Sequence, residues 1–410
     1  MKLITFLGTG NYQPAIYVDS GKEFETCFFV QAVAEWHKPD EVLIMLTPTA
    51  KKQENWGKLQ DILHQSDINF RGVDIPDGRS ETELWEIFQA LAGQFEQGEE
   101  VLFDVTHAFR SLPVLALLAA NYLRVARGIT MLDVVYGAYE AREEETNRAP
   151  VFSLMPFMNL LDWVTATDRF IKSGDANDLG QLLKEANKVP HMQDNIPKSE
   201  LPTRLSGLSG TLGDLSNALR LTRPQEVAKY SAQLAERIQG VEEEANRYAP
   251  PFGVLLDQIS NAYLPFSDDS LKTQLDLVNW YVERGQEVQA VTLANEWCIS
   301  WTCQQLGLEV SERKTRESVT RAISSISRKR RGEKYDDHPL IECVSKLDNC
   351  EAKIILWDKL SGLRNDIAHC GMREEKGQTV KLIQQVVTYI TELNTLYNQS
   401  SNQGEALCKQ

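Results

Sequence analysis

The sequence predicts an α/β domain with a mostly parallel sheet at its N-terminal end, followed by an all-α helical region. Up to about residue 155, short runs rich in β-forming residues alternate with amphipathic stretches of helical period. Beyond that point almost only the helical period remains, interrupted by polar breaks that contain glycine and proline. Alternating strands and helices are typical of the Rossmann-like βαβ pattern, so we expect that fold in the first part of the chain.

Each expected element follows from its local pattern. The expected strands are apolar runs at residues 3–7, 42–46, 70–75, 101–105 and 131–136. The expected helices fill the gaps, near residues 28–36, 55–64, 82–95 and 112–125. Because each helix returns the chain to the same end of the sheet, the strands should run largely parallel.

The breaks in the helical part suggest further divisions. They lie around residues 173–180, 190–202 and 249–251. We expect four segments: an α/β domain over 1–155, a helical linker over 156–270, a second helical domain over 271–397 and a flexible tail over 398–410.

Composition bounds the class of protein. With 410 residues, 42% of them hydrophobic and 25% charged, the chain is expected to be a soluble globular protein of two or three domains. Its seven cysteines are scattered without a Cys-x-x-Cys pair, which predicts a reducing compartment and argues against structural zinc. We see no cleavable signal, and the longest apolar stretch, 112–120, is too short to cross a bilayer. We therefore expect a cytoplasmic protein without membrane contact.

Charge is unevenly distributed. The net charge of −15 argues against broad, non-specific binding of nucleic acid, because Lys and Arg normally neutralise the phosphates. Between Glu312 and Lys334, however, nine Lys or Arg residues face three Glu, which leaves a local charge of +6. Such a patch fits weak RNA binding, and it equally fits a solvated helix face and loop.

The loop after the first expected strand is rich in glycine. Gly8, Thr9, Gly10 and Asn11 offer close backbone approach, free N–H groups and a hydroxyl, all of which suit phosphate or ribose. The third glycine of a dinucleotide fingerprint is missing, which weakens the alternative of a Rossmann oxidoreductase. A tight turn alone would also explain the two glycines.

A second polar loop follows the strand at 101–105. Asp104 is expected to cap the turn and orient His107, Thr106 to contact ribose or phosphate, and Arg110 to pair with an anionic oxygen. The plainer alternative is that Asp104 and Thr106 only cap the next helix. Neither loop carries the Gly-Lys-Ser/Thr of a P-loop, so hydrolysis of nucleoside triphosphates is not expected.

Near the C-terminus, Arg364, Asn365 and His369 lie within six residues of one another. An imidazole to move a proton, a guanidinium to hold charge on a phosphate and an amide to orient both are sufficient for RNA cleavage without a metal. An Arg followed by four to six residues and then a His also arises by chance: six residues separate Arg331 from His338, but this pair lies among turn formers without an apolar period, and we expect a loop there. Residues 354–368 instead show helical spacing.

Five residues along a helix turn through roughly 500°, which separates Arg364 and His369 by about 140°. We therefore expect a composite site, in which two copies of this helix meet at a homodimer interface. Gly371 is the expected residue just past the helix end. The alternative is a surface arginine and a half-buried histidine on an ordinary bundle helix.

The sequence resembles a known family at these motifs. Asp104-Val105-Thr106-His107 looks like the Asp-x-Thr-His-Gly signature of CRISPR-associated proteins that join an N-terminal CARF sensor domain to a C-terminal HEPN ribonuclease domain. Arg364, Asn365 and His369 match the HEPN motif of Arg, a polar neighbour, and His after four to six residues. One departure is Ala108, which replaces the final glycine of the sensor signature.

The resemblance implies a switch. Family members bind cyclic oligoadenylates made in type III CRISPR defence, and this messenger activates the nuclease. It implies cyclic tetra-adenylate, or alternatively hexa-adenylate, as activator, single-stranded RNA as substrate, and a homodimer or higher oligomer. No cofactor and no metal is implied, and the products would carry 2′,3′-cyclic phosphate ends. Arg364, Asn365 and His369 would be catalytic. The ligand-binding residues would be Gly8, Thr9, Gly10, Asn11, Asp104, Thr106, His107 and Arg110.

Two further readings stay open. In one, the sensor domain also degrades the cyclic oligoadenylate and so acts as a ring nuclease. In the other, the chain is a non-catalytic, nucleotide-responsive regulator, although it has no recognisable basic recognition helix for DNA.

Overall fold

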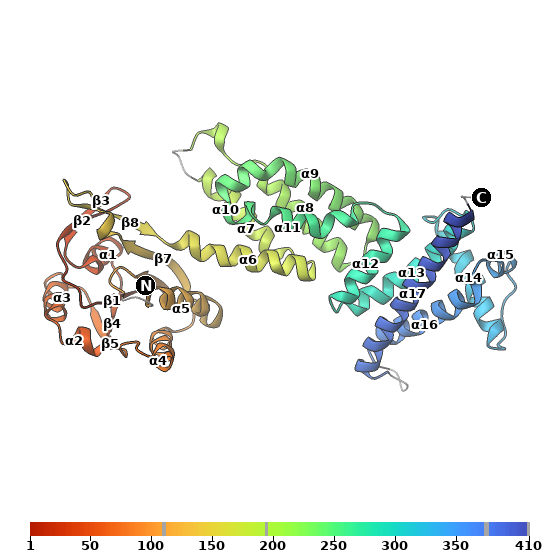
Figure 1. Cartoon of the computed structure of the whole chain (residues 1–410), viewed down its shortest axis with the longest axis horizontal. Coiled ribbons are helices and arrows are strands. Elements are labelled where there is room, and N and C mark those ends of the chain that lie inside the picture. The colour runs from red at the N-terminus through yellow and green to blue at the C-terminus, as the bar shows by residue number, and fades with distance from the viewer. Residues whose placement is uncertain (109–111, 193–195, 373–376, 408–410) are drawn as a thin grey trace. The chain divides into compact units, whose positions relative to one another are not determined.

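The structure is a computed structural model that describes residues 1–108, 112–192, 196–372 and 377–407, with side chains up to residue 400. The chain forms two compact units, Met1–Asp162 and Trp163–Gln410 (Figure 1). The first is an α/β unit and the second is helical. Arg110, one of the expected ligand-binding residues, lies outside the described residues.

The α/β unit is built on a sheet of eight strands in the order β3-β2-β8-β7-β6-β1-β4-β5. Within it, β5, β4, β1, β6 and β7 are mutually parallel, whereas β8 runs antiparallel to β7, and β3 to β2. The strands are β1 (Lys2–Leu7), β2 (Ala15–Asp19), β3 (Lys22–Thr26), β4 (Glu41–Leu46), β5 (Phe70–Asp74), β6 (Glu100–Asp104), β7 (Thr130–Gly137) and β8 (Arg148–Ser153). The mostly parallel α/β fold expected from the sequence is confirmed, and all five expected strands are present.

Three strands were not expected. The hairpin β2–β3 has only five residues in each strand, and β3 carries three charged residues, so neither strand stands out as an apolar run. β8 is exposed at three of its six positions and lies at the antiparallel end of the parallel core. Such strands are defined by their pairing across the sheet more than by their own pattern.

Helices cover both faces of the sheet. They are α1 (Phe29–His37), α2 (Pro48–Lys51), α3 (Glu54–Gln65), α4 (Glu81–Ala92), α5 (Leu112–Arg127) and the short η1 (Tyr139–Ala141). Successive residues of β1 point to opposite faces: Leu3 packs in the core with α1 and α3, and Ile4 packs in the core with α4 and α5. This alternation places the parallel strands between two helical layers.

The second unit is helical throughout. Its elements are α6 (Met155–Ser173, which begins in the first unit), α7 (Asn177–His191), η2 (Lys198–Glu200), α8 (Leu205–Arg220), α9 (Pro224–Tyr248), α10 (Pro250–Gly253), α11 (Leu256–Tyr263), η3 (Leu264–Phe266), α12 (Leu271–Glu283), α13 (Glu287–Gln305), α14 (Arg313–Arg330), α15 (Ile341–Ser345), α16 (Cys350–Ala368) and α17 (Thr379–Leu407). Residues 333–338 have no regular structure, which confirms the loop expected around His338.

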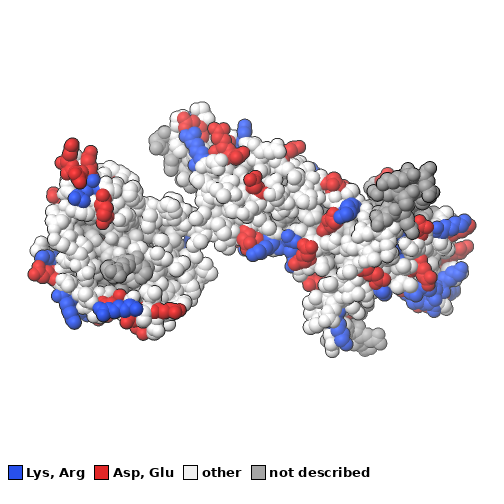
Figure 2. Space-filling model, viewed as in Figure 1, with Lys and Arg blue, Asp and Glu red and all other residues white. Residues whose placement is uncertain are grey.

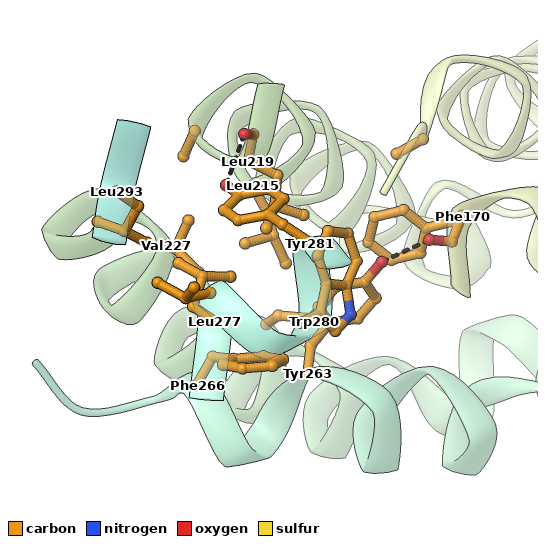
Figure 3. Close-up of a cluster of buried hydrophobic side chains, with 14 of the residues drawn as sticks. Phe170, Leu215, Leu219, Val227, Tyr263, Phe266, Leu277, Trp280, Tyr281 and Leu293 are labelled. Carbon is orange, nitrogen blue, oxygen red and sulfur yellow. Dashed lines mark hydrogen bonds between the residues drawn. The ribbon is translucent and has the colours of Figure 1, made fainter. Parts of the chain in front are cut away.

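One apolar core runs through most of this unit (Figure 3). Tyr263 and Tyr281 are fully buried there, and each hydroxyl donates to a main-chain carbonyl, that of Phe170 and that of Leu219 respectively. Because each hydroxyl has a hydrogen-bond partner, burying the ring stabilises the fold without leaving an unsatisfied polar group. Among the described helices, none is long and apolar enough to span a membrane.

Candidate functional site

The first candidate site lies at the point in the sheet where the order of the parallel strands reverses. Counted along the chain, the five parallel strands take the spatial order 3-2-1-4-5, and β1 and β6 are the neighbours at which the order reverses. Ligands of open α/β sheets bind outside the carboxyl ends of the strands at this point. The loops that follow β1 and β6 are the two polar loops singled out in the sequence, starting at Gly8 and at Val105.

Asp104 stabilises the loops around this crevice through buried hydrogen bonds. It is fully buried at the end of β6, where its carboxylate accepts hydrogen bonds from the Thr5 hydroxyl (2.7 Å) and from the Thr106 N–H (2.9 Å). The Thr106 hydroxyl in turn accepts from the Gly137 N–H at 2.8 Å. These bonds tie together the ends of β1, β6 and β7. Asp104 therefore caps the turn as expected.

The expected link from Asp104 to His107 is not present as a hydrogen bond. The Nε2 atom of His107 is buried and has no partner among the described residues. Burial lowers the pKa of His107, while the charges of Asp104 and Glu140 act in the opposite direction. The imidazole is therefore expected to be neutral at pH 7, with a nitrogen free to accept or donate a hydrogen bond.

Tyr12 contacts both loops. Its ring centroid lies 4.1 Å from that of His107, and its hydroxyl accepts a 2.8 Å hydrogen bond from the Gly8 N–H. Burial raises the pKa of Tyr12 to about 12, so the hydroxyl keeps its proton. One of the N–H groups expected to meet a phosphate is thus already bound to a side chain of the same loop.

Two cavities, of about 500 and 470 Å³, share Gly8, Thr9 and His107 as lining residues. The smaller is also lined by Gly10, Asn11 and Thr106, so six of the eight expected ligand-binding residues surround these two spaces. Asp104 lines neither. The two cavities are also lined by polar and aromatic residues that were not expected there from the sequence: Phe6, Tyr12, Gln13, Tyr17, Thr47, Thr49, Asp77, Arg79, Tyr139 and Glu140.

Some of these residues could have been found. Thr47, Thr49 and Asp77 follow β4 and β5, and the rule that ligands approach the carboxyl ends of strands applies to those loops as well. Asp77 accepts from the Thr49 hydroxyl at 3.1 Å and pairs with Arg79 at 2.9 Å. Tyr17 and Tyr139 gave no such signal, because they belong to the unexpected strand β2 and the short η1.

The second candidate site is a groove in the helical unit. Trp357, Ser361, Arg364 and Asn365 follow one another at helical spacing on α16 and face a space of about 640 Å³. α13 and α14 provide the opposite wall. The residues contributed by α13 and the α14 region are Asn295, Glu296, Ile299, Ser311, Arg313, Arg316, Glu317, Thr320 and Arg321.

The groove brings together two features that are separate in the sequence. Arg313, Arg316 and Arg321 belong to the basic stretch that begins near Glu312, and they lie opposite Arg364. On the face drawn in Figure 2, Lys and Arg gather toward the α14 end of the helical unit. Positive charge therefore accumulates beside the expected catalytic arginine although the whole chain is strongly acidic.

His369 lies one turn beyond Asn365. Its N–H donates to the Asn365 carbonyl at 3.1 Å, so the helical ladder continues to it, and the left-handed residues Cys370 and Gly371 then end the helix. Gly371 was expected just past this end. Arg364, Asn365 and His369 are all exposed, but His369 does not line the groove that the other two face.

Arg331 and His338, the other Arg-to-His pair, have different surroundings. Arg331 forms ion pairs with Glu333 (2.7 Å) and with Asp358 (2.5 Å). His338 accepts a hydrogen bond from the Leu340 N–H at 3.2 Å. This pair therefore has structural contacts. Arg364, in contrast, has no ion pair or hydrogen bond from its guanidinium within the described part of the chain.

Comparison with known proteins places the chain near one family. Residues 159–265 match the family model described as "CRISPR-associated protein MJ1674, second domain". The CRISPR-associated protein MJ1674 of Methanocaldococcus jannaschii is 26% identical over 114 residues, which is 27% of this chain and 18% of that protein. The chain thus matches less than a fifth of the relative, and the region matched by the family model lies in sequence between the residues of the two candidate sites. Within these limits, both matches support a CRISPR-associated protein.

Proposed function

We propose that the protein is a cyclic-oligoadenylate-activated endoribonuclease that cuts single-stranded RNA without a metal. The observation that carries this proposal is the placement of Arg364 and Asn365 in an arginine-lined groove, with His369 one helical turn further along α16. Support for a CRISPR-associated protein fits an activator of this kind. The α/β unit would be the CARF sensor and the C-terminal helices the HEPN nuclease.

The α/β crevice is suited to a nucleotide messenger. It offers the Thr9 hydroxyl and main-chain N–H groups for phosphate, and aromatic rings of Tyr12, Tyr17 and Tyr139 for a base. A cyclic messenger made of identical units suits a pocket shared by two copies of the sensor, because each copy presents the same groups. Cyclic tetra-adenylate is the favoured ring, with hexa-adenylate as the alternative.

The proposed reaction is a transesterification. The ribose 2′-oxygen forms a bond to the adjacent phosphorus while the bond from phosphorus to the 5′-oxygen breaks. His369 accepts the proton of the 2′-hydroxyl, Arg364 binds the charged phosphate oxygens, and Asn365 orients them. The leaving 5′-oxygen takes a proton from the His369 imidazolium of the second copy. The products carry 2′,3′-cyclic phosphate and 5′-hydroxyl ends, so DNA would not be cut.

A homodimer is part of this proposal, and exposed apolar residues support it. Val380, Ile383 and Val387 form an exposed stripe on α17, close in sequence to Gly377, whose N–H donates to Asp366 on α16 at 3.0 Å. The stripe therefore begins beside the end of α16 that carries His369. Burying it against a second copy would bring the two α16 ends together. In the α/β unit, α5 has a second exposed stripe: Val114, Leu118, Tyr122 and Val125.

One experiment tests the proposal directly. Purified protein is mixed with fluorescently labelled single-stranded RNA in EDTA, with cyclic tetra-adenylate, cyclic hexa-adenylate or neither. We expect cleavage only with one of the rings, 2′,3′-cyclic phosphate on the products and no cutting of the equivalent DNA. Wild-type protein that leaves RNA intact with both rings, or His369→Ala protein that still cuts, would show that the assignment is wrong.

A second activity, degradation of the messenger itself, is favoured by one observation. His107 lines the cavity, and its buried Nε2 atom has no partner among the described residues. Because the pKa of its imidazole is lowered, a neutral His107 turned toward the cavity could accept a proton from a ribose hydroxyl of the cyclic messenger. Incubating the full chain with labelled cyclic tetra-adenylate tests this. Linear product from wild type that disappears in His107→Ala would support a ring nuclease, and an intact ring would exclude it.

A further inference from the structure

The four arginines of the α16 groove differ in what they already bind. Arg316 is held on all sides: it donates to the Ser300 hydroxyl and to the Glu296 carboxylate, each at 2.7 Å, and its side chain is only 25% exposed. A guanidinium bound in this way fixes α14 against α13. It has little capacity left for a ligand, so we regard Arg316 as structural.

Arg313 is weakly held. Its guanidinium pairs with Glu317 at 2.7 Å, but the side chain is 91% exposed. An exposed ion pair of this kind contributes little, because solvent screens it and both side chains lose freedom. A stronger anion could therefore displace Glu317 from Arg313 at low cost.

Among the described residues, Arg321 and Arg364 are the groove arginines whose guanidinium groups form no hydrogen bond or ion pair, although the charge of Arg321 helps to lower the pKa of Glu317. Within the described ranges neither guanidinium forms a hydrogen bond or ion pair, and both face the groove from opposite walls. The planar, five-donor guanidinium matches the oxygens of a phosphate group. Two such groups across one groove suit a phosphodiester chain that passes between α14 and α16.

We propose that α14 forms the phosphate-binding wall of the RNA groove, with Arg321 as its main contact and Arg313 as a secondary one. This inference rests on the proposed nuclease function and adds the path of the substrate. The RNA backbone follows α14 and reaches Arg364 and His369 at the scissile linkage. RNA is favoured over an acidic protein segment because the same groove holds Arg364 and Asn365. Arg321 is thus a substrate-positioning residue and not a catalytic one.

The test measures binding without cleavage. Full-length protein with His369→Ala is titrated onto a fluorescein-labelled single-stranded oligouridylate with cyclic tetra-adenylate present, and anisotropy is followed from 50 to 300 mM KCl. We expect Arg321→Ala to weaken binding about 5- to 10-fold at 100 mM salt. The slope of log affinity against log salt should fall by about 0.7, the value for one phosphate contact on a single strand. Arg321→Lys should restore most of the slope.

Lys329→Ala is the matched control. Lys329 is an exposed cation on the same helix, two turns beyond Arg321, and does not line the groove. Its removal changes the net charge equally, so we expect less than a two-fold effect on affinity. An equal loss of RNA affinity in both variants would mean that α14 acts only through its overall charge, and it would refute the inference that Arg321 forms a specific phosphate contact.

Two other outcomes would overturn the inference. One is unchanged RNA binding and salt slope in Arg321→Ala. The other is displacement of RNA by poly-glutamate at similar concentration, which would assign the groove to an acidic protein segment. Because binding is measured in protein that cannot cut, the result does not depend on the nuclease activity. Absence of cleavage in wild type would refute the proposed function, whereas failure of Arg321→Ala to weaken binding refutes only the α14 wall.

Discussion

The Tyr12 hydroxyl accepts a 2.8 Å hydrogen bond from the Gly8 N–H, so the loop after β1 occupies one of its own donors. A β-carbon at Gly8 would lie 2.8 Å from that hydroxyl and 3.0 Å from the His107 carbonyl oxygen. At Gly8 the two polar loops therefore leave no room for an added carbon atom. A ligand that uses the Gly8 N–H must first displace Tyr12, which adds a cost to binding.

Tyr12→Phe tests this relationship. Removing the hydroxyl frees the Gly8 N–H while the ring stays against His107. Since a single hydrogen bond contributes about 0.5 to 1.5 kcal/mol, we expect the messenger to bind about 2- to 10-fold more tightly. Calorimetric titration with cyclic tetra-adenylate measures the change. Tyr17→Phe, which removes a hydroxyl from the same cavity without touching Gly8, should leave the affinity nearly unchanged. Weaker binding in Tyr12→Phe would instead make the hydroxyl a ligand contact.

Gly8→Ala should close the crevice. The added carbon has to push against the His107 main chain, which cannot move as a side-chain end can. We expect messenger affinity to fall at least about ten-fold, with loss of RNA cleavage at limiting messenger. Gly57→Ala is the control, because nothing lies within 4 Å of a β-carbon built at that helical position in α3. That change should be neutral or slightly stabilising. Equal messenger binding by Gly8→Ala and wild type would mean that the ligand does not use this loop.

The catalytic assignment predicts unequal effects of two histidines. His369→Ala and Arg364→Ala should each lower the cleavage rate by about 10² to 10⁴, the range for loss of a general acid–base or a charge-stabilising group. Binding of the messenger should not change, since the residues lie in the other unit. His338→Ala, in the loop where six residues separate Arg331 from His338, should keep full activity. Gel analysis of single-turnover cleavage distinguishes these results, and loss of activity in His338→Ala alone would reverse the assignment.

The dimer prediction concerns α17. Val387→Glu places a charge in the exposed apolar stripe, so we expect a shift toward monomer in size-exclusion chromatography with light scattering. RNA cleavage should fall with it, because one copy would no longer meet the other. Gln385→Glu adds a charge at an exposed position on the opposite side of the helix and should leave the dimer intact. A monomeric Val387→Glu protein that still cuts at the wild-type rate would refute a composite site.

The lowered pKa of His107 should make the stability of the folded protein depend on pH. Because burial disfavours its protonated form in the folded protein, the unfolded chain binds the proton more readily. Its contribution to stability is therefore present above the ordinary histidine pKa of 6.5 and is lost as pH falls below that value. The protection factors of the β6 amides, which correct for the slower intrinsic exchange at low pH, should therefore fall between pH 7 and pH 5. The fall should be smaller in His107→Gln, and an equal fall in both proteins would contradict this prediction.

Local pattern was sufficient for the parallel core of the fold. Local sequence pattern predicted all five parallel strands and the longer helices α1, α3, α4 and α5. The pattern is clearest in β1, β4 and β6, because strands buried on both faces must be apolar along their length. The same reasoning distinguished α16 from the loop at 333–338. It missed β2, β3 and β8, whose partly exposed residues form strands through pairing at the other end of the sheet.

Residue type and position also identified part of the crevice, since Gly8, Thr9, Thr106 and His107 follow two strands that end side by side. What only the tertiary structure decided is how those residues are used. Thr5 holds Asp104, and Tyr12 covers His107, across 99 and 95 positions of sequence respectively. The groove is a similar case, because nothing in the sequence predicts that the basic stretch of α14 lies beside Arg364 of α16. They become opposite walls of the groove only when the helices pack, because the packed faces of two helices and their crossing angle decide which side chains meet, and not the order of the residues in the sequence.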